Sequence, residues 1–317
     1  MSRPVIALFT GDPAGIGPEL VERVLADPAT ETQADIILIG QRGALKVPSW
    51  VRWHDWPGAA APPFAPSVAS ADNGRFMLRG LEEGVRLVNA GEADALCFAP
   101  LNKGALRLGG MHQEDELRWF AELMSYSGIC GELNVLENLW TARVTSHVAL
   151  RDVSRLLSAE GVADAIGMID GALRASGVPQ PRIAVCGLNP HNGDNGNYGD
   201  EEARIIEPGV RLAAQRGHTA EGPFPADTAF VRAIRKEGGY DGVVTMYHDQ
   251  GQIAMKLMGF ERGVTVHGGL PIPIATPAHG TAYDITGRGI AHTGAMVNAL
   301  RVALRMGLHH RAQRQAA

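Results

Sequence analysis

Short apolar runs alternate along the chain with longer segments in which apolar residues recur every three or four positions. The short runs predict buried strands, and the longer spacing predicts amphipathic helices packed on a sheet. The predicted strands are Val5–Phe9, Ile36–Gly40, Ala95–Ala99, Ala142–Ser146, Ile183–Leu188, Val243–Met246 and Val264–Val266. The predicted helices are Gly80–Ala90, Val162–Ala175, Glu201–Gln215 and Met296–Met306. This alternation predicts an α/β fold.

Composition narrows the class of protein. With 317 residues, 45% of them hydrophobic, the chain can bury the cores of two modest domains. The net charge of −5 and the lack of a basic run interleaved with aromatic residues argue against nucleic acid as a partner. The three cysteines are far apart in the sequence, which favours a reducing cytoplasm over a disulfide framework. No apolar run is long enough to predict a membrane span.

Three histidines share one sequence context, each just past the carboxyl end of a predicted strand. They are His147 in "TSHVALRDV", His191 in "CGLNPHNG" and His248 in "MYHDQG". Open α/β sheets bind ligands at that edge. Three neutral imidazoles leave positions on a divalent ion free for a substrate oxygen, although any one of them alone is more typical of an ordinary loop or a partly buried histidine than of a metal ligand. Asp152 and Asp249 could orient the rings, and turn or capping chemistry is the alternative for Asp249.

Two glycine-rich stretches are candidates for ligand binding. In "LFTGDPAGIGPEL", the spacing of Gly11, Gly15 and Gly17 matches neither the dinucleotide fingerprint nor a phosphate-binding loop, and a strand–turn–helix junction explains the stretch locally. The second stretch, "TPAHGTAYDITGRGIAHTG", combines glycines that permit close approach with charged side chains, which suits an adenosine site. The stretch Gly193–Gly199 predicts a mobile or ligand-covering loop.

Seven segments together resemble the 4-hydroxythreonine-4-phosphate dehydrogenase family of vitamin B6 biosynthesis, which is related to the isocitrate and isopropylmalate dehydrogenases. These segments are "GDPAGIGPEL", "APLNKGAL", "TSHVALRDV", "CGLNPHNGDNGNYGDEE", "GPFPADTAF", "MYHDQGQIAMKL" and "HGTAYDITGRGIA", and they span almost the whole chain in family order. The resemblance implies an isocitrate/isopropylmalate dehydrogenase-like fold of α/β/α layers with a cleft between two domains. We place the domains at residues 1–104 with 257–317 and at residues 105–256.

The resemblance also implies the activity. It is an NAD- or NADP-dependent oxidation of a secondary alcohol of a hydroxy acid, followed by decarboxylation. The enzyme would be a homodimer whose divalent metal site takes His147, His191 and His248 from both subunits. Zinc is the first choice, with cobalt, manganese, nickel and magnesium open. The candidate catalytic residues are Lys256, which would pair with a substrate anion or move a proton, and Asp249. The candidate cofactor-binding residues are Asp12, Gly15, His279, Gly280, Asp284 and Arg288.

The sequence departs from the family where substrate is bound. A usual Gly-His-Thr-Glu stretch is absent: Asp115–Arg118 stand in its place, with His112 as a gapped alternative. Thr265 replaces a usual asparagine and Ile274 a usual arginine. The candidate substrate-binding residues are therefore Lys256, Glu116, Arg118, Thr265 and Ile274.

Loss of a forked guanidinium donor weakens recognition of a phosphate. We therefore expect an altered, unphosphorylated substrate, such as the dihydrodiol carboxylate of terephthalate. An authentic 4-hydroxythreonine-4-phosphate dehydrogenase, a metal-dependent hydrolase and a non-catalytic binder are the alternatives.

Overall fold

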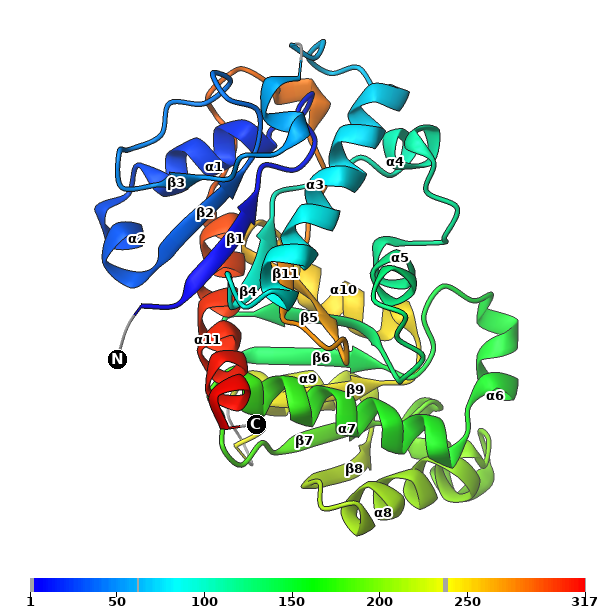
Figure 1. Ribbon diagram of the computed structural model, residues 1–317. Coiled ribbons are helices and arrows are strands. Elements are labelled where there is room, and N and C mark those ends of the chain that lie inside the picture. The colour runs from blue at the N-terminus through cyan, green and yellow to red at the C-terminus, as the bar shows by residue number, and fades with distance from the viewer. Residues whose placement is uncertain (1–2, 62, 236–238, 317) are drawn as a thin grey trace. The chain divides into compact units, whose positions relative to one another are not determined.

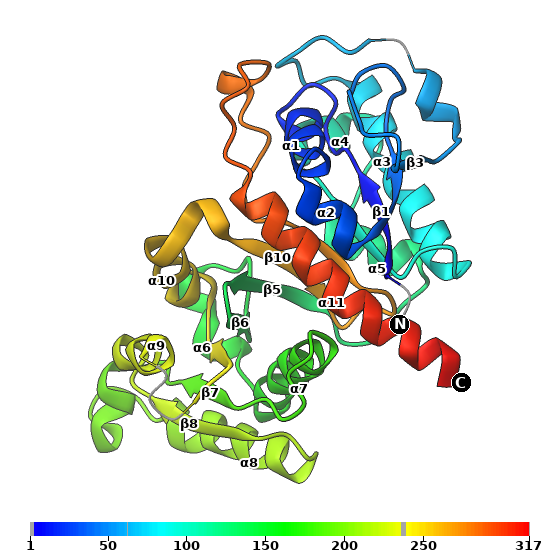
Figure 2. The same ribbon diagram turned by 90° about the vertical axis from the view of Figure 1, so that its left-hand side faces the viewer.

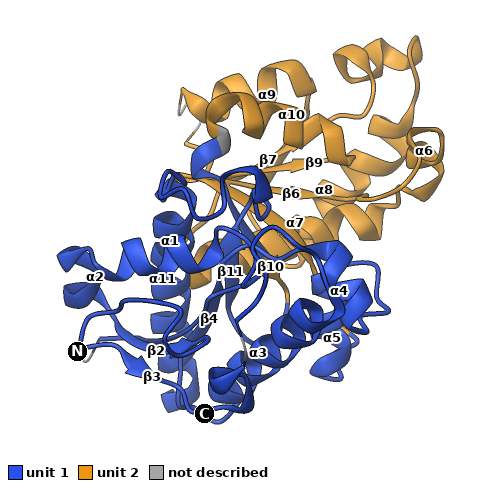
Figure 3. Cartoon of the chain, turned by 90° about the horizontal axis from the view of Figure 1, so that it is seen from above, with its two compact units in different colours: residues 1–127, 261–266, 270–317 blue, residues 128–260, 267–269 orange. Residues whose placement is uncertain are grey.

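The computed structural model describes residues 3–61, 63–235 and 239–316, and it divides the chain into two compact units (Figure 3). Unit 1 comprises residues 1–127, 261–266 and 270–317, and unit 2 comprises residues 128–260 and 267–269. Each unit is an α/β assembly built on its own group of neighbouring strands (Figure 1).

The sheet of unit 1 is mainly parallel. Its strand order is β3-β2-β1-β4-β11-β10, and among the described residues of this unit only the β10–β11 pair is antiparallel. The strands are β1 (Val5–Phe9), β2 (Asp35–Ile39), β3 (Arg52–Trp53), β4 (Ala95–Phe98), β10 (Val264–Gly268, which ends in unit 2) and β11 (Ile274–Pro277). Since β1, β4 and β11 are parallel neighbours, the loops that follow them leave the same edge of the sheet.

Helices cover both faces of the unit 1 sheet. The long helix α11 packs on β1, β4 and β11, and α3 packs on β1, β2 and β4 (Figure 2). The helices of this unit are α1 (Gly17–Leu25), α2 (Pro28–Gln33), α3 (Ala71–Asn89), α4 (Lys103–Gly109), α5 (Glu116–Leu123) and α11 (Gly294–Ala316). Short 3-10 turns are η1 (Pro57–Ala60), η6 (Tyr283–Ile285) and η5 (Phe260–Arg262), whose first residue belongs to unit 2. The apolar residues predicted at helical spacing thus face a sheet.

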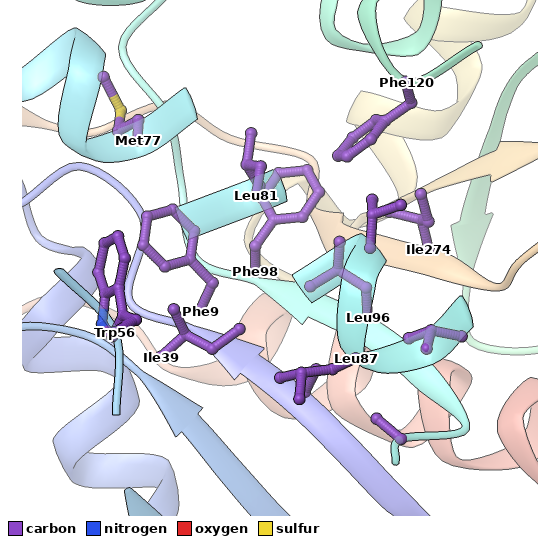
Figure 4. Packing of buried hydrophobic residues seen from close by; sticks show 14 of the residues in the cluster. Phe9, Ile39, Trp56, Met77, Leu81, Leu87, Leu96, Phe98, Phe120 and Ile274 are labelled. Atoms are coloured by element: carbon purple, nitrogen blue, oxygen red, sulfur yellow. The ribbon is translucent and has the colours of Figure 1, made fainter. Parts of the chain in front are cut away.

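The core of unit 1 also contains the segment 105–127, which the sequence analysis assigned to the second domain. Trp119 and Phe120 of α5 are buried in the same apolar cluster as Phe9 and Phe98. Figure 4 shows Phe9, Phe98 and Phe120 of this cluster. The rings of Phe98 and Phe120 lie 6.0 Å apart between centroids, a spacing typical of stabilising aromatic pairs. Burial of these two aromatic side chains therefore fixes α5 to unit 1, and the predicted boundary at residue 104 falls inside this unit.

Unit 2 has the strand order β5-β6-β9-β7-β8, and in the part of this unit that the structure describes only the β5–β6 pair is antiparallel. The strands are β5 (Gly131–Leu136), β6 (Leu139–Arg143), β7 (Ile183–Cys186), β8 (Ala220–Phe224) and β9 (Gly242–Thr245). The helices are α6 (Val153–Leu156), α7 (Ala159–Ala175), α8 (Glu207–Gln215), α9 (Ala226–Ile234) and α10 (His248–Gly259). Short turns are η2 (Leu150–Asp152), η3 (Pro190–Gly196) and the π-helical η4 (Glu202–Ile206).

None of the helices in the described ranges is both long enough and apolar enough to cross a membrane.

Candidate functional site

The three histidines leave neighbouring parallel strands of unit 2 at the same edge of the sheet. His147 follows β6, His248 follows β9 and His191 follows β7, and β9 lies between the other two strands. The carboxyl edge of a parallel sheet is where open α/β folds bind their ligands. The predicted strand-end placement is therefore confirmed for all three side chains.

His147 and His248 are close enough to share one ion. Their ring centroids lie 5.6 Å apart. Two imidazoles on one tetrahedral zinc, with Zn–N bonds near 2 Å, place their centroids roughly 5 Å apart, so the observed spacing fits two ligands of one metal ion. The Oδ1 atom of Asp249 lies 2.7 Å from Nδ1 of His248. When Nδ1–H donates to that carboxylate, the lone pair of Nε2 is left to bind a metal.

His191 lies in an unusual left-handed turn. Residues 191–195 all have positive φ, including His191 at 52° and Asn192 at 56°. Left-handed backbone costs roughly 1–2 kcal/mol for each residue other than glycine, so neighbouring groups must hold it in place. The segment that leads into this turn is held by the buried carboxylate of Glu202, whose Oε1 accepts hydrogen bonds from the backbone N–H groups of Leu188 (2.8 Å) and Asn189 (2.7 Å).

Within residues 3–61, 63–235 and 239–316, no three His, Cys, Asp or Glu side chains of this single chain are grouped closely enough to hold a metal ion. The ring of His191 instead lies 6.5 Å from that of Tyr198. Asp152, a candidate for orienting a histidine, is paired with Arg155 at 3.5 Å. The chain thus brings His147, His248 and Asp249 together, and the part of His191 in a metal site stays a prediction.

In unit 1 the stretch "HGTAYDITGRG" forms a loop, residues 279–289, that lies against the opening stretch of the chain. The backbone N–H of Ile16 donates to the carbonyl of Thr281 at 3.1 Å. The hydroxyl of Tyr283 donates to Oδ2 of Asp12 at 2.6 Å. The carboxylate of Glu19, in the first turn of α1, accepts from the backbone N–H of Gly289 at 3.2 Å. We call residues 279–289 the cofactor loop, after the role that the sequence predicts for them.

The cofactor loop exposes to solvent three of the residues that the sequence predicts to bind the cofactor. Gly280, Asp284 and Arg288 are exposed, and a methyl group added to Gly280 would meet no atom within 4 Å. His279 is half-buried, and burial lowers its pKa, so its ring favours the neutral form at neutral pH. Exposed polar side chains beside a neutral imidazole fit a nucleoside, and these four residues stay candidates for cofactor binding.

Asp12 and Gly15 are buried in the structure, which contradicts the prediction that they contact the cofactor. Asp12 is fully buried, and a Cβ at Gly15 would stand 2.8 Å from Cβ of Thr281, so both residues face the protein rather than open space. Burial raises the pKa of Asp12, and the hydrogen bonds from Tyr283, Ala14 and Asn73 act in the opposite direction. Neither residue offers a surface for contact with a cofactor. The glycine is required by close approach to Thr281.

Residues 27–303 match the family described as "Pyridoxal phosphate biosynthetic protein PdxA". The chain belongs to the PdxA family. It is 50% identical to "Putative 4-hydroxythreonine-4-phosphate dehydrogenase 2" of Pseudomonas aeruginosa, over 97% of this chain and 98% of that one. It is 34% identical to the D-threonate 4-phosphate dehydrogenase of Salmonella typhimurium, over 96% and 100% of the two chains. The crystal structure of 4-hydroxythreonine-4-phosphate dehydrogenase from Klebsiella pneumoniae is similar with a TM-score of 0.85 and 33% identity, covering 96% of this chain and 98% of that one.

These relatives confirm the predicted family and class of enzyme. This PdxA family member is an oxidoreductase that acts on a CH–OH group, and the family implies a nicotinamide cofactor and a divalent metal. The α/β fold is also confirmed by the similar crystal structure. The hydrolase alternative has no support among the named relatives.

The predicted substrate residues of this PdxA family member lie in different settings. Lys256 is exposed in the last turn of α10, the helix that begins at His248. It lies eight residues after His248, which corresponds to a rise of about 12 Å along the helix axis. In unit 1, Glu116 is nearly buried, with Nζ of Lys103 3.9 Å from its Oε2. Arg118 is exposed beside Asp115, the residue that caps α5. Lys256, Glu116 and Arg118 stay candidates.

Two positions that depart from the family lie on neighbouring strands of unit 1. Thr265 is half-buried on β10, in register with Thr276 of β11. Ile274 is fully buried within the apolar cluster of unit 1 (Figure 4). The prediction that Ile274 binds substrate is therefore corrected: its side chain fills the core, and it has no surface with which to touch a ligand.

Sequence reasoning missed the side chains that hold the candidate residues in place. Tyr283 and Asn73 donate hydrogen bonds to Asp12. Glu202 accepts a hydrogen bond from the backbone N–H of Asn189, in the loop that carries His191. Tyr283 and Glu202 lie inside family-like segments, but nothing in the local sequence distinguishes them from surface residues. A buried carboxylate needs partners from elsewhere in the chain, and those partners become visible only in three dimensions.

Proposed function

We propose that this PdxA family member oxidises the secondary alcohol of a 4-phosphorylated hydroxy acid, with NAD or NADP as hydride acceptor and a divalent metal at the histidine edge of unit 2, and that decarboxylation follows. The observation that carries the proposal is the pair of rings of His147 and His248 at the carboxyl ends of adjacent parallel strands, with Asp249 directing one of them. The family and its named dehydrogenases supply the reaction class.

The histidines and their partners would prepare the metal site. His147 and His248 supply two nitrogen ligands, and Asp249 selects the tautomer of His248 that leaves Nε2 available. A bound ion there would lower the pKa of the substrate alcohol and stabilise the negative charge that develops on decarboxylation. Lys256 on the same helix would pair with a substrate anion or move a proton. The donor set suits zinc first, with cobalt, manganese and nickel as alternatives.

We further propose that the third ligand, His191, comes from the second subunit of a homodimer. The helix that begins at His248 exposes Ile253 (60%) and Leu257 (84%), which are four residues apart and therefore share one face. Large apolar side chains exposed together favour burial against a partner. A homodimer thus explains both the exposed face and the lack of a three-ligand group within the described part of one chain.

The cofactor would bind at the cofactor loop of unit 1. His279, Gly280 and Asp284 would contact the adenosine, and Arg288 would meet a 2′-phosphate if the cofactor is NADP. The exposure of Gly280, Asp284 and Arg288 supports this proposal, as does the neutral ring favoured for His279. No dinucleotide fingerprint is needed, because the loop itself supplies the nucleoside surface.

For the substrate, the relatives favour a phosphorylated acid over the unphosphorylated one that the sequence departures suggested. A relative at 50% identity and another at 34% are named after 4-phosphorylated substrates. The dihydrodiol carboxylate of terephthalate has no comparable support. Because Ile274 is a core residue, the missing arginine at that position is weaker evidence against phosphate than the sequence implied.

The test is an NAD(P) reduction assay with purified, metal-reconstituted protein. We expect turnover of 4-phosphohydroxythreonine or D-threonate 4-phosphate, and much slower turnover of the same acids without phosphate. His147→Ala and His248→Ala should each abolish metal binding as well as turnover. Preference for unphosphorylated acids would contradict the proposed substrate, and a monomer on light scattering at assay concentration would contradict the shared site.

A further inference from the structure

Asp12 is the meeting point of three segments of unit 1. Its Oδ2 accepts the hydroxyl of Tyr283 at 2.6 Å, from the cofactor loop. Its Oδ1 accepts the backbone N–H of Ala14 at 3.0 Å, from its own turn, and the amide of Asn73 at 3.3 Å, from the first turns of α3. The carboxylate is fully buried. Burial of a carboxylate is unfavourable unless hydrogen-bond donors satisfy it, so the carboxylate and its three donors keep one another in position.

Tyr283 is fixed at its backbone as well as at its hydroxyl. Its carbonyl accepts a hydrogen bond from the hydroxyl of Ser67 at 2.7 Å. The residue before it, Ala282, has a φ of 42°, which is uncommon for any residue with a Cβ. Such a backbone persists only where its surroundings determine it. The exposed candidates Gly280 and Asp284 lie within three residues of Tyr283. The tyrosine therefore anchors the part of the loop that faces solvent.

We infer that Asp12 and Tyr283 form a positioning pair that holds the cofactor loop in the shape that binds the nicotinamide dinucleotide. The inference rests on the proposed function for the identity of the ligand. Neither residue touches the cofactor in this role: Asp12 acts through Tyr283, and Tyr283 acts through its neighbours in the loop. When only a fraction of molecules holds the binding shape, the observed dissociation constant rises by the inverse of that fraction.

The test is Tyr283→Phe, which removes one hydroxyl and keeps the ring. We expect the Kd for NADH, followed by nucleotide fluorescence on the full chain, to rise on the order of tenfold, which corresponds to about 1.4 kcal/mol. The KM for NAD should rise in parallel, while the metal affinity stays unchanged. Hydrogen–deuterium exchange of residues 279–289 should become faster. Asp12→Asn, which keeps an acceptor oxygen, should give a smaller effect than Asp12→Ala.

Tyr240→Phe is the matched control. Tyr240 donates its hydroxyl to the carboxylate of Glu221 at 2.8 Å in unit 2, so the same kind of hydrogen bond is removed away from the cofactor loop. We expect its NADH affinity and its loop exchange to equal those of the wild type. Unchanged exchange of residues 279–289 in Tyr283→Phe would overturn the inference. A wild-type protein that binds no nicotinamide nucleotide would instead overturn the proposed function, and the exchange experiment would still decide whether the pair positions the loop.

Discussion

Glu202 accepts a hydrogen bond from the backbone N–H of Asn189 at 2.7 Å, and by this contact a π-helical turn holds the loop that carries His191. The π-helical turn Glu202–Ile206 comes directly before α8, and single π turns of this kind are frequent at functional sites. The same carboxylate also holds the backbone of Leu188 and the side chain of Asn189. The sequence separates this glutamate from His191 by a glycine- and asparagine-rich stretch, and only the fold joins them.

Replacing Glu202 should disturb both stability and metal binding. In Glu202→Ala, the N–H groups of Leu188 and Asn189 lose their buried acceptor, at about 1–3 kcal/mol for each unsatisfied group. We expect a lower free energy of unfolding in urea and a weaker affinity for zinc or cobalt by titration. Glu202→Gln should recover part of both. Glu207→Gln, at an exposed carboxylate of α8, serves as the control, and an equal loss of metal affinity in that variant would refute the role of Glu202.

Removal of the Asp249 carboxylate should lower the affinity for the metal without lowering the stability of the fold. Asp249 is 72% exposed at its side chain and its contact is with Nδ1 of His248, so Asp249→Ala costs little packing. Loss of such an orienting partner typically reduces metal affinity about 10–100-fold. Calorimetric titration with zinc should show this loss at unchanged melting temperature. Asp152→Ala is the control, because Asp152 pairs with Arg155, and its metal affinity should match the wild type.

The raised pKa of Asp12 predicts a pH-dependent stability. Because burial raises this pKa, the folded chain binds more protons than the unfolded chain between about pH 4, the ordinary range of a carboxyl group, and the raised value. The contribution of Asp12 to the free energy of unfolding therefore falls as pH rises through that window. Urea unfolding at pH 4 to 7 should show Asp12→Asn gaining stability relative to the wild type with rising pH. A difference that is constant over this range would show that Asp12 titrates normally.

Ile274 should behave as a core residue and not as a substrate residue. Ile274→Ala removes buried methyl groups, which costs about 2–5 kcal/mol in a packed core. Ile274→Arg, which introduces the residue type usual in the family, places a charge in the apolar cluster and should prevent folding. Chemical unfolding measures the first variant and circular dichroism the second. Ile290→Ala, at an exposed isoleucine, should change stability by no more than about 0.5 kcal/mol. A folded, active Ile274→Arg would show that the side chain reaches solvent.

The amino-acid sequence by itself determined the alternation of strands and helices and the chemistry at the strand ends. Apolar runs long enough to be buried on both faces, such as Val5–Phe9 and Ile183–Leu188, are read directly from hydrophobic pattern. The first forms β1 with the predicted bounds, and the second forms β7, which ends at Cys186. The predicted run Ala142–Ser146 lies too late, since β6 is Leu139–Arg143. The partly polar strands β5 and β8 have no such pattern, so the sequence did not predict them. Their stability comes from pairing with neighbouring strands in the sheet.

Tertiary structure alone decided which side chains act together. The order of strands places β9 next to β6, and so brings together the rings of His147 and His248, which are far apart in the sequence. Burial separated Ile274 and Asp12 from the candidates for ligand contact, and aromatic packing assigned α5 to unit 1. The physical reason is the same in each case: local pattern specifies the period and polarity of an element, whereas burial and hydrogen-bond partners depend on contacts between segments hundreds of residues apart, as Asp12 and Tyr283 show.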